Sequence, residues 1–223
     1  ALEPAMIAAA QKSGRVLAEA FMYRHHPQTI QVKEIVDSGA LGKLQLIKGA
    51  FTFTLTREGN YRNVKEMGGG SLWDVGCYPI SFARMIVGEE PLEAFGWQVE
   101  GPGEIDEAFY GELRFGNGVH MQFDSGFKAH YRTYLEIVGS AGVLNIPSPF
   151  KTGAKSEIQL TRGDEAKTIK IRGQELYLGE VEDMYEAVVN GKAPRISLAD
   201  SRGNIATILK LLESAQMSRK VSF

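Results

Sequence analysis

The amino-acid sequence predicts an α+β protein in which a large, mainly antiparallel sheet with one open face follows a short α/β fragment. Phe109, Gly111, Leu113 and Phe115 alternate with Tyr, Glu and Arg, which is the two-residue period of a half-buried strand. The Gly-Asn-Gly segment at 116–118 follows and is typical of a hairpin turn. Two amphipathic helices end the sequence, so we expect helices to cover one face of the sheet.

Composition and charge exclude several classes of protein. Of the 223 residues, 43% are hydrophobic and 23% are charged, as in an ordinary globular protein. The net charge of −2 gives no attraction to nucleic acid or an anionic membrane, and no apolar run approaches the roughly 20 residues of a membrane span. The single Cys77 excludes an internal disulfide framework and suits a reducing compartment. We therefore expect a cytoplasmic protein without nucleic-acid or membrane partners.

The first elements are expected to be a helix and then a strand. Pro4 occupies a first-turn position, and Gly14 after Ser13 is a C-terminal cap. Residues 15–22 are a short apolar run that we predict to be a buried strand. A buried strand directly after a helix is typical of the end of a parallel α/β layer. We therefore expect the natural chain to begin upstream of Ala1.

The middle of the chain alternates between helices and extended segments. In order, the pattern predicts a helix over 27–38, a strand over 44–55, an irregular glycine-rich segment over 56–70 and a helix over 71–87. Glycines 39 and 88 follow the two helices directly and are expected to end them.

The rest of the sheet follows the hairpin turn. Its return strand is expected to place one set of side chains on the apolar face: Val119, Met121, Phe123 and Phe127. Further strands are expected over 133–138 and 143–146, and another hairpin over 157–171.

Helical periodicity returns near the C-terminus. Val181, Met184, Tyr185 and Val188 fall on one face of a helix that Gly191 ends. A second helix is expected to begin at the Ser197-x-x-Asp200 capping box and to bury a stripe of four residues: Ile205, Ile208, Leu209 and Leu212.

The second face of the sheet is half aromatic and half polar. Tyr110, Tyr134, His120 and Arg114 all belong to it. Such a face is typical of a subunit interface, although a solvated face explains the same pattern.

Several catalytic classes lack their motifs. The chain has neither a Gly-x-Gly-x-x-Gly nor a Gly-x-x-x-x-Gly-Lys-Ser/Thr loop for phosphate, and no Gly-x-Ser-x-Gly nucleophile turn. His25, His26, His120 and His130 are not spaced as metal ligands, so we expect no metal site.

One block remains as a candidate site, from the glycine run 68–70 to Tyr78. Three glycines allow the backbone to approach a ligand closely and to turn abruptly into a helix. Asp74 and Tyr78 are four residues apart and share a helix face, with Gly76 keeping the surface between them low. A carboxylate beside a phenol is a plausible pair for proton transfer. Alternatively, Asp74 stabilises the helix dipole and Tyr78 belongs to the core.

Two further clusters could bind a polar ligand. Tyr61 and Arg62 precede the glycine run, and Arg24 and His26 lie where the α/β fragment ends. Arginines and aromatic residues in loops are suited to gripping polar groups. Equally, Arg62 can be a solvated charge, and Arg24 and His26 can form an ion pair or a helix cap.

With these residues in place, the chain resembles the carboxyl-terminal part of Gfo/Idh/MocA-family oxidoreductases, in the branch of glucose–fructose oxidoreductase, dihydrodiol dehydrogenase and sugar dehydrogenases. The motifs that carry the resemblance occur in the family's order: 20–27 (Ala-Phe-Met-Tyr-Arg-His-His-Pro), 38–42, 68–78, 88–91, 115–118, 138–142 and 197–200.

The resemblance implies a role for each part of the chain. Residues 1–24 would be a remnant of a Rossmann domain that binds NAD or NADP, and residues 25–223 the substrate-binding and oligomerisation domain. Asp74 and Tyr78 would be the catalytic pair, with Asp74 also touching substrate. Tyr61, Arg62 and Arg24 would contact the cofactor, and Arg62 and His26 the substrate. The family's glycine motif and its Glu-Lys-Pro segment are absent and would lie upstream.

The resemblance therefore implies hydride transfer between a nicotinamide and a sugar, polyol or diol, in a homo-oligomer built through the open sheet face. We expect this 223-residue chain to be inactive by itself. A non-catalytic oligomerisation scaffold is the alternative, and a sugar-binding module without redox chemistry is a third reading.

Overall fold

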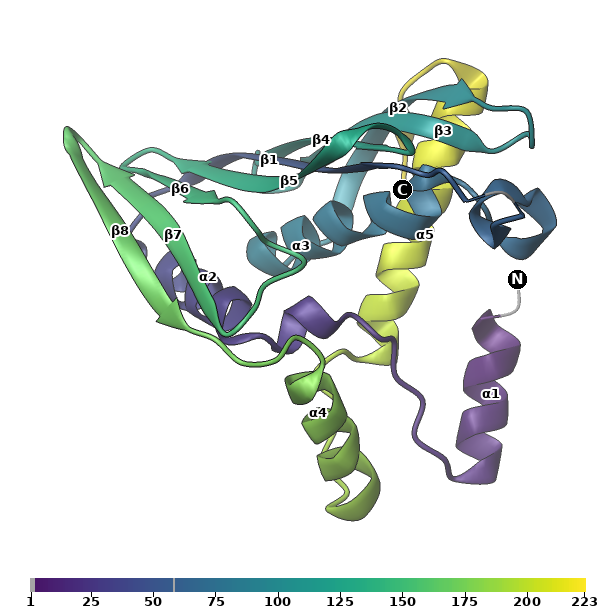
Figure 1. Cartoon of the computed structure of the whole chain (residues 1–223), viewed down its shortest axis with the longest axis horizontal. Coiled ribbons are helices and arrows are strands. Elements are labelled where there is room, and N and C mark those ends of the chain that lie inside the picture. The colour runs from purple at the N-terminus through teal and green to yellow at the C-terminus, as the bar shows by residue number, and fades with distance from the viewer. Residues whose placement is uncertain (1–2, 58) are drawn as a thin grey trace.

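The computed structural model describes residues 3–57 and 59–223, which form a nine-stranded sheet with helices beneath one face (Figure 1). The order of strands across the sheet is β8-β7-β6-β5-β1-β4-β3-β2-β9. In chain order the strands are β1 (Leu44–Thr54), β2 (Pro91–Glu100), β3 (Asp106–Phe115), β4 (His120–Gly126), β5 (Lys128–Gly139), β6 (Val143–Ile146), β7 (Lys155–Arg162), β8 (Glu165–Arg172) and β9 (Val221–Ser222).

The pairing of the strands confirms the predicted α+β class and the mainly antiparallel sheet. β1 and β4 run parallel, and each of the other neighbouring pairs is antiparallel. The predicted hairpin joins β3 to β4, with Arg114 opposite His120 and Gly118 at a φ of 87°. β1 lies between β4 and β5, so the first strand of the chain becomes the centre of the sheet.

The helices lie on one side of the sheet (Figure 1). They are α1 (Glu3–Ser13), α2 (Pro27–Asp37), α3 (Cys77–Val87), α4 (Leu178–Val189) and α5 (Leu198–Met217). α3 approaches the central strands β1 and β4, and α5 packs against β2 and β9 at one edge, whereas α1 and α4 lie farther from the sheet. None of the helices in the described ranges combines the length and the apolar character needed to cross a membrane.

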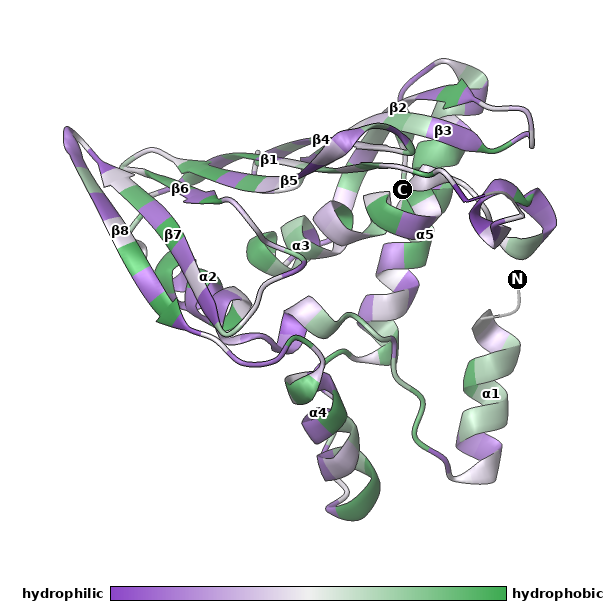
Figure 2. Ribbon diagram, viewed as in Figure 1, coloured by the Kyte–Doolittle hydropathy of each residue, from purple (hydrophilic) through white to green (hydrophobic). Residues whose placement is uncertain are grey.

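The core fills the space between the sheet and the helices. Along the strands, hydrophobic and hydrophilic residues alternate (Figure 2). Phe109, Leu113 and Met121 are buried on the inner face, whereas Tyr110 is 51% exposed on the outer face. The outer face of the sheet is therefore left open by the helices that the structure describes (Figure 1).

The predicted strand over residues 15–22 is wrong. The chain there is extended without strand pairing up to Phe21, and a 3-10 turn follows at Met22–His25. A strand requires a neighbour to complete its hydrogen-bond ladder, and the described residues supply none at this place. An apolar run is therefore not sufficient to predict a strand. The run is not fully buried either, because Val16 is exposed.

The predicted stripe of α5 is wrong at one position. Ile208 is buried as expected, but Leu209 is 52% exposed, and Leu211 is buried in its place. α5 packs against β2, where the Gly96 N–H donates to the Ser214 hydroxyl, and Thr207 is also buried. Ser197 is confirmed as the N-cap, because it accepts a hydrogen bond from the Asp200 backbone N–H, whereas the Asp200 carboxylate binds Arg84 and Arg24.

Candidate functional site

The candidate pair lies where the loop after β1 enters α3. Asp74 belongs to a π-helical turn over Leu72–Gly76, and Tyr78 follows in the first turn of α3. π-helical turns are rare in proteins, and those that occur often lie at functional sites. The helix predicted over 71–87 is thus present, but its first turn is wider than an α-helix.

Three of the predicted site residues come together: Tyr61, Arg62 and Asp74. The Nε atom of Arg62 donates to Oδ2 of Asp74 at 2.6 Å, with side-chain exposures of 28% and 15%. The same guanidinium lies 4.6 Å above the ring of Tyr61. Hydrogen bonding to Asp74 raises the pKa of Arg62, so the cation is permanent. The loop thus holds a positive charge in a fixed position beside the Asp74 carboxylate. Arg62 is therefore not the solvated charge that the sequence left open.

Tyr78 lies in a cluster of aromatic rings. Its ring centroid is 5.4 Å from Phe21, 5.5 Å from Tyr23, 5.3 Å from Phe51 and 5.5 Å from Phe150. Its hydroxyl donates to the Met22 sulfur at 3.8 Å, which is a weak bond. Burial, followed by neighbouring groups that include Cys77 and Asp74, raises the pKa of Tyr78 well above its usual value. The phenol is therefore protonated at neutral pH, as a proton donor to a carbonyl must be.

The glycine run packs against the chain itself. A Cβ on Gly69 would lie 2.5 Å from the Arg62 carbonyl oxygen, and one on Gly70 would overlap Oδ1 of Asp106. Gly70 also has a φ of 115°, which L-residues rarely adopt. Likewise, a Cβ on Gly76 would meet Ser125 at 3.0 Å. The close approach that the sequence suggested for a ligand is thus made by neighbouring loops and strands.

Arg24 and His26 are held by structural contacts. Arg24 is buried, pairs with Asp200 at 3.0 Å and donates to the Ser81 hydroxyl at 2.9 Å. His26 is fully buried, accepts from the Gln28 N–H at 3.1 Å and caps α2. Burial lowers the pKa of His26, which keeps the ring neutral. These contacts match the ion pair and helix cap left open above, and a ligand role for either residue requires them to break.

The sequence reasoning missed Asp106, the first residue of β3. This buried carboxylate accepts from the Ser71 hydroxyl and the Leu72 N–H, both at 2.7 Å. It lies 32 residues from Asp74 along the chain, in a segment where the sequence shows only a turn followed by alternation. No local pattern could have associated it with the start of the helix.

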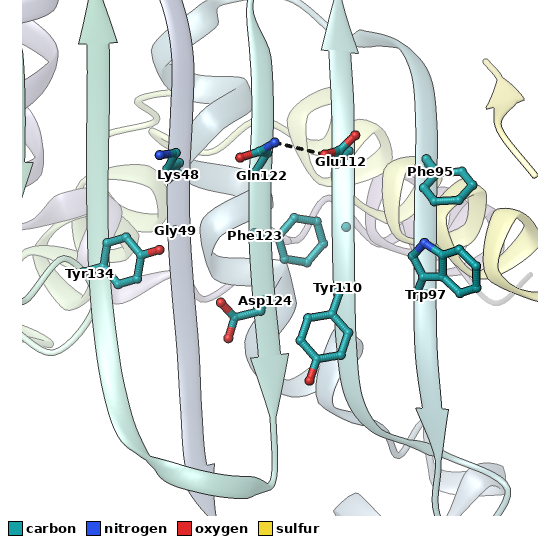
Figure 3. A pocket seen from close by; sticks show the side chains of 11 residues that line it. Lys48, Gly49, Phe95, Trp97, Tyr110, Glu112, Gln122, Phe123, Asp124 and Tyr134 are labelled. Atoms are coloured by element: carbon teal, nitrogen blue, oxygen red, sulfur yellow. Dashed lines mark hydrogen bonds between the residues drawn. The ribbon is translucent and has the colours of Figure 1, made fainter.

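A second feature is a hollow of about 400 Å³ on the open face of the sheet (Figure 3). One row of Cα partners crosses it, from Trp97 through Tyr110, Asp124 and Ala50 to Tyr134. Gly49 and Gly111, which carry no side chain, also line the hollow. Lys48, Gln122 and Glu112 form the next row, with Gln122 donating to Glu112 at 3.0 Å. The hollow faces away from α3 and thus from Tyr78. Among the described residues, no cluster of His, Cys, Asp and Glu is arranged to hold a metal ion.

Comparison with known proteins places this geometry in a family. Over 200 residues the chain is 30% identical to a dTDP-3,4-didehydro-2,6-dideoxy-alpha-D-glucose 3-reductase of Actinomadura kijaniata, covering 88% of this chain and 60% of the relative. Over 215 residues it is 29% identical to D-xylose 1-dehydrogenase (NADP(+)) 2 of Haloferax volcanii, and the match covers 95% of this chain and 66% of the relative.

A solved structure has the same fold. The 3-ketoreductase KijD10 from Actinomadura kijaniata, in complex with NADP and TDP-benzene, superposes with a TM-score of 0.89 at 26% identity, over 95% of this chain and 66% of that one. The chain thus spans 60–66% of the length of these curated relatives. The model of the GFO/IDH/MocA C-terminal domain matches residues 29–145. This chain therefore belongs to the GFO/IDH/MocA family.

Proposed function

We propose that the chain is the substrate-side part of an NAD(P)-dependent oxidoreductase that transfers hydride between a nicotinamide and a sugar, polyol or diol. The observation that carries the proposal is the Arg62–Asp74 pair at 2.6 Å, one turn before a protonated Tyr78. The names of the relatives, which include a sugar 3-reductase and an NADP-dependent xylose dehydrogenase, support it.

The chemistry assigned to these side chains is proton transfer and orientation. When bound, NAD(P)H supplies the hydride to the carbonyl carbon of the substrate. Tyr78 Oη donates its proton to the carbonyl oxygen, so that an alcohol and a phenolate result. Asp74, fixed by Arg62, accepts a hydrogen bond from a substrate hydroxyl and orients the carbonyl toward Tyr78.

The residues in the described ranges offer a flat surface that a dinucleotide could contact, but no site for its pyrophosphate. Tyr61 is 47% exposed under the Arg62 guanidinium and offers a flat surface. The glycine run is filled by the chain's own atoms and cannot cradle a pyrophosphate. We therefore assign the phosphate-binding domain to the remainder of a longer protein, residues 1–24 to that domain and residues 25–223 to substrate binding and oligomerisation.

The test is an enzyme assay on the complete reading frame. Purified protein is mixed with NADPH or NADH and keto-sugars, or with NADP or NAD and aldoses or trans-diols, and absorbance at the nicotinamide band is followed. We expect turnover by the complete protein and none by the 223-residue chain. No turnover in any combination, or no dinucleotide binding by the complete protein, would leave the scaffold alternative.

We also propose that the open sheet face joins copies of the chain. Trp97 and Tyr110 are exposed side by side, and Asp124 forms an ion pair with Arg132 in the same region. Aromatic rings with paired charges are typical of such interfaces. Replacing Trp97 and Tyr110 by Arg is expected to reduce the mass measured by sedimentation to that of a monomer, because two charges would face each other. Tyr185→Arg on α4, equally exposed, is the control and should keep the mass.

A further inference from the structure

The start of the catalytic helix is held by a buried carboxylate from another part of the chain. Asp106 is only 5% exposed. Its Oδ2 accepts from the hydroxyl of Ser71 and from the N–H of Leu72, both at 2.7 Å. The backbone N–H groups at the start of a helix have no partner within the helix, and a negative charge there is favoured by the dipole. Asp106 therefore caps the turn that carries Asp74.

The same carboxylate links this turn to the sheet. The Ser71 hydroxyl lies 3.0 Å from the Ser125 hydroxyl of β4. Because the Ser71 proton is directed to Asp106, Ser125 donates to Ser71. Asp106 is the first residue of β3, so a chain of hydrogen bonds joins β3, the turn and β4.

Asp106 also contacts the segment that holds the Arg62 loop. Its Oδ1 fills the place that a Cβ on Gly70 would take. The Gly70 N–H donates to the Arg62 carbonyl at 2.9 Å, and the Asp74 N–H donates to the Gly70 carbonyl at 3.1 Å. Gly70 therefore connects the backbones of Arg62 and Asp74, and Asp106 fixes where Gly70 lies.

From these contacts we propose that Asp106 is a positioning residue, which sets the Arg62 loop against the Asp74 turn and so aligns Asp74 and Tyr78. Its consequence for catalysis rests on the function proposed above, whereas its consequence for the geometry does not. A carboxylate suits this place because one oxygen accepts two hydrogen bonds while the other packs on a glycine. Asparagine retains an acceptor oxygen but lacks the charge, so it should restore part of the effect, and alanine none.

Cys77 reports on this geometry without any assay of activity. It is the chain's single cysteine, it is buried, and it lies three residues after Asp74. A thiol reagent such as 5,5′-dithiobis(2-nitrobenzoate) reaches it only when the turn opens. We expect Asp106→Ala to accelerate the reaction of native protein by about 10-fold to 100-fold, since a cap with two donors is lost. Asp106→Asn should lie between alanine and wild type.

Ser214→Ala is the matched control. Its hydroxyl is also buried, accepts from the Gly96 N–H at 3.1 Å and donates to the Arg219 carbonyl at 2.6 Å, away from the site. It should lower the unfolding midpoint but leave the Cys77 rate within about threefold of wild type. Equal acceleration by Asp106→Ala and Ser214→Ala, or an unchanged rate in Asp106→Ala, would overturn the proposal.

A second pair of variants, at Gly70 and Gly68, tests the contact between Asp106 and the glycine run. Gly70→Ala places a methyl group against the carboxylate, whereas Gly68→Ala meets no atom within 4 Å although its φ of 75° is also left-handed. We expect Gly70→Ala to accelerate the Cys77 reaction as Asp106→Ala does, and Gly68→Ala to have a much smaller effect. The opposite order would contradict a role for the Asp106 contact.

In the complete enzyme, Asp106→Ala is expected to lower kcat at least about 10-fold with KM for the dinucleotide unchanged, because alignment of the proton donor affects the chemical step. Asp106→Asn should recover part of kcat. An unchanged kcat beside a faster Cys77 reaction would remove the alignment of Asp74 and Tyr78 from the proposal and thus overturn it. Absence of turnover in the wild type would refute the proposed function alone, and the Cys77 rates would still decide the positioning role.

Discussion

Replacing Tyr78 by phenylalanine is expected to lower kcat of the complete enzyme by about 10²-fold to 10⁴-fold, the usual contribution of a positioned proton donor. The stability of the folded protein should change little. The Tyr78 hydroxyl donates only the weak bond to the Met22 sulfur at 3.8 Å, and the four ring contacts remain in the variant. Steady-state kinetics and thermal unfolding, measured on the same preparation, separate the two effects.

Tyr23→Phe supplies the control for that experiment. Tyr23 is fully buried, its ring is 5.5 Å from that of Tyr78, and its hydroxyl donates to the Tyr78 carbonyl at 3.2 Å. This variant should lower the unfolding midpoint, since it removes a buried hydrogen bond, and should keep most of kcat. If Tyr78→Phe retains the wild-type rate, or if Tyr23→Phe slows turnover as much, Tyr78 is not the proton donor.

Local signals in the sequence predicted most of the fold. The Asn-Gly turn of the hairpin, the Ser197 cap and the glycines that follow the helices act through neighbouring residues, so they are visible in a single segment. The strand assigned to residues 15–22 failed because pairing depends on a partner elsewhere. The stripe of α5 failed at Leu209 because contact with β2, rather than periodicity alone, decided which residues are buried.

The candidate site shows the same limit. Asp74 and Tyr78 were found from their spacing, but the ion pair between Arg62 and Asp74 depends on how the intervening loop folds back. A run of three glycines indicates that some group lies close to the backbone, but it does not indicate which group. Here it is the Arg62 backbone and Asp106, and only coordinates could identify the partner. The catalytic and binding roles of the candidate site stay predictions for six residues: Tyr61, Arg62, Arg24, His26, Asp74 and Tyr78.

Replacing Arg84 by methionine is expected to destabilise the protein by about 1.5–3 kcal/mol, the usual contribution of hydrogen bonds to charged groups. Arg84 lies on α3 with 3% of its side chain exposed. It donates to both oxygens of Glu90, at 2.7 and 2.5 Å, and to Asp200 at 2.9 Å. Asp200 also pairs with Arg24, so this network joins α3 to the start of α5 and to the turn that contains Arg24. Urea unfolding gives the free-energy change.

Lys65→Met is the control for Arg84→Met, because Lys65 pairs with Glu104 in full exposure and such pairs contribute little. The double variant of Arg84 and Arg24 tests the network itself. Because both arginines share Asp200, their losses of stability should be non-additive by at least about 0.5 kcal/mol. Additive losses would mean that Arg24 is held independently of Asp200, and a dinucleotide contact by Arg24 would then regain support over the ion pair. Non-additive losses would assign Arg24 to the fold, since its charge cannot be committed to Asp200 and also be free for a ligand.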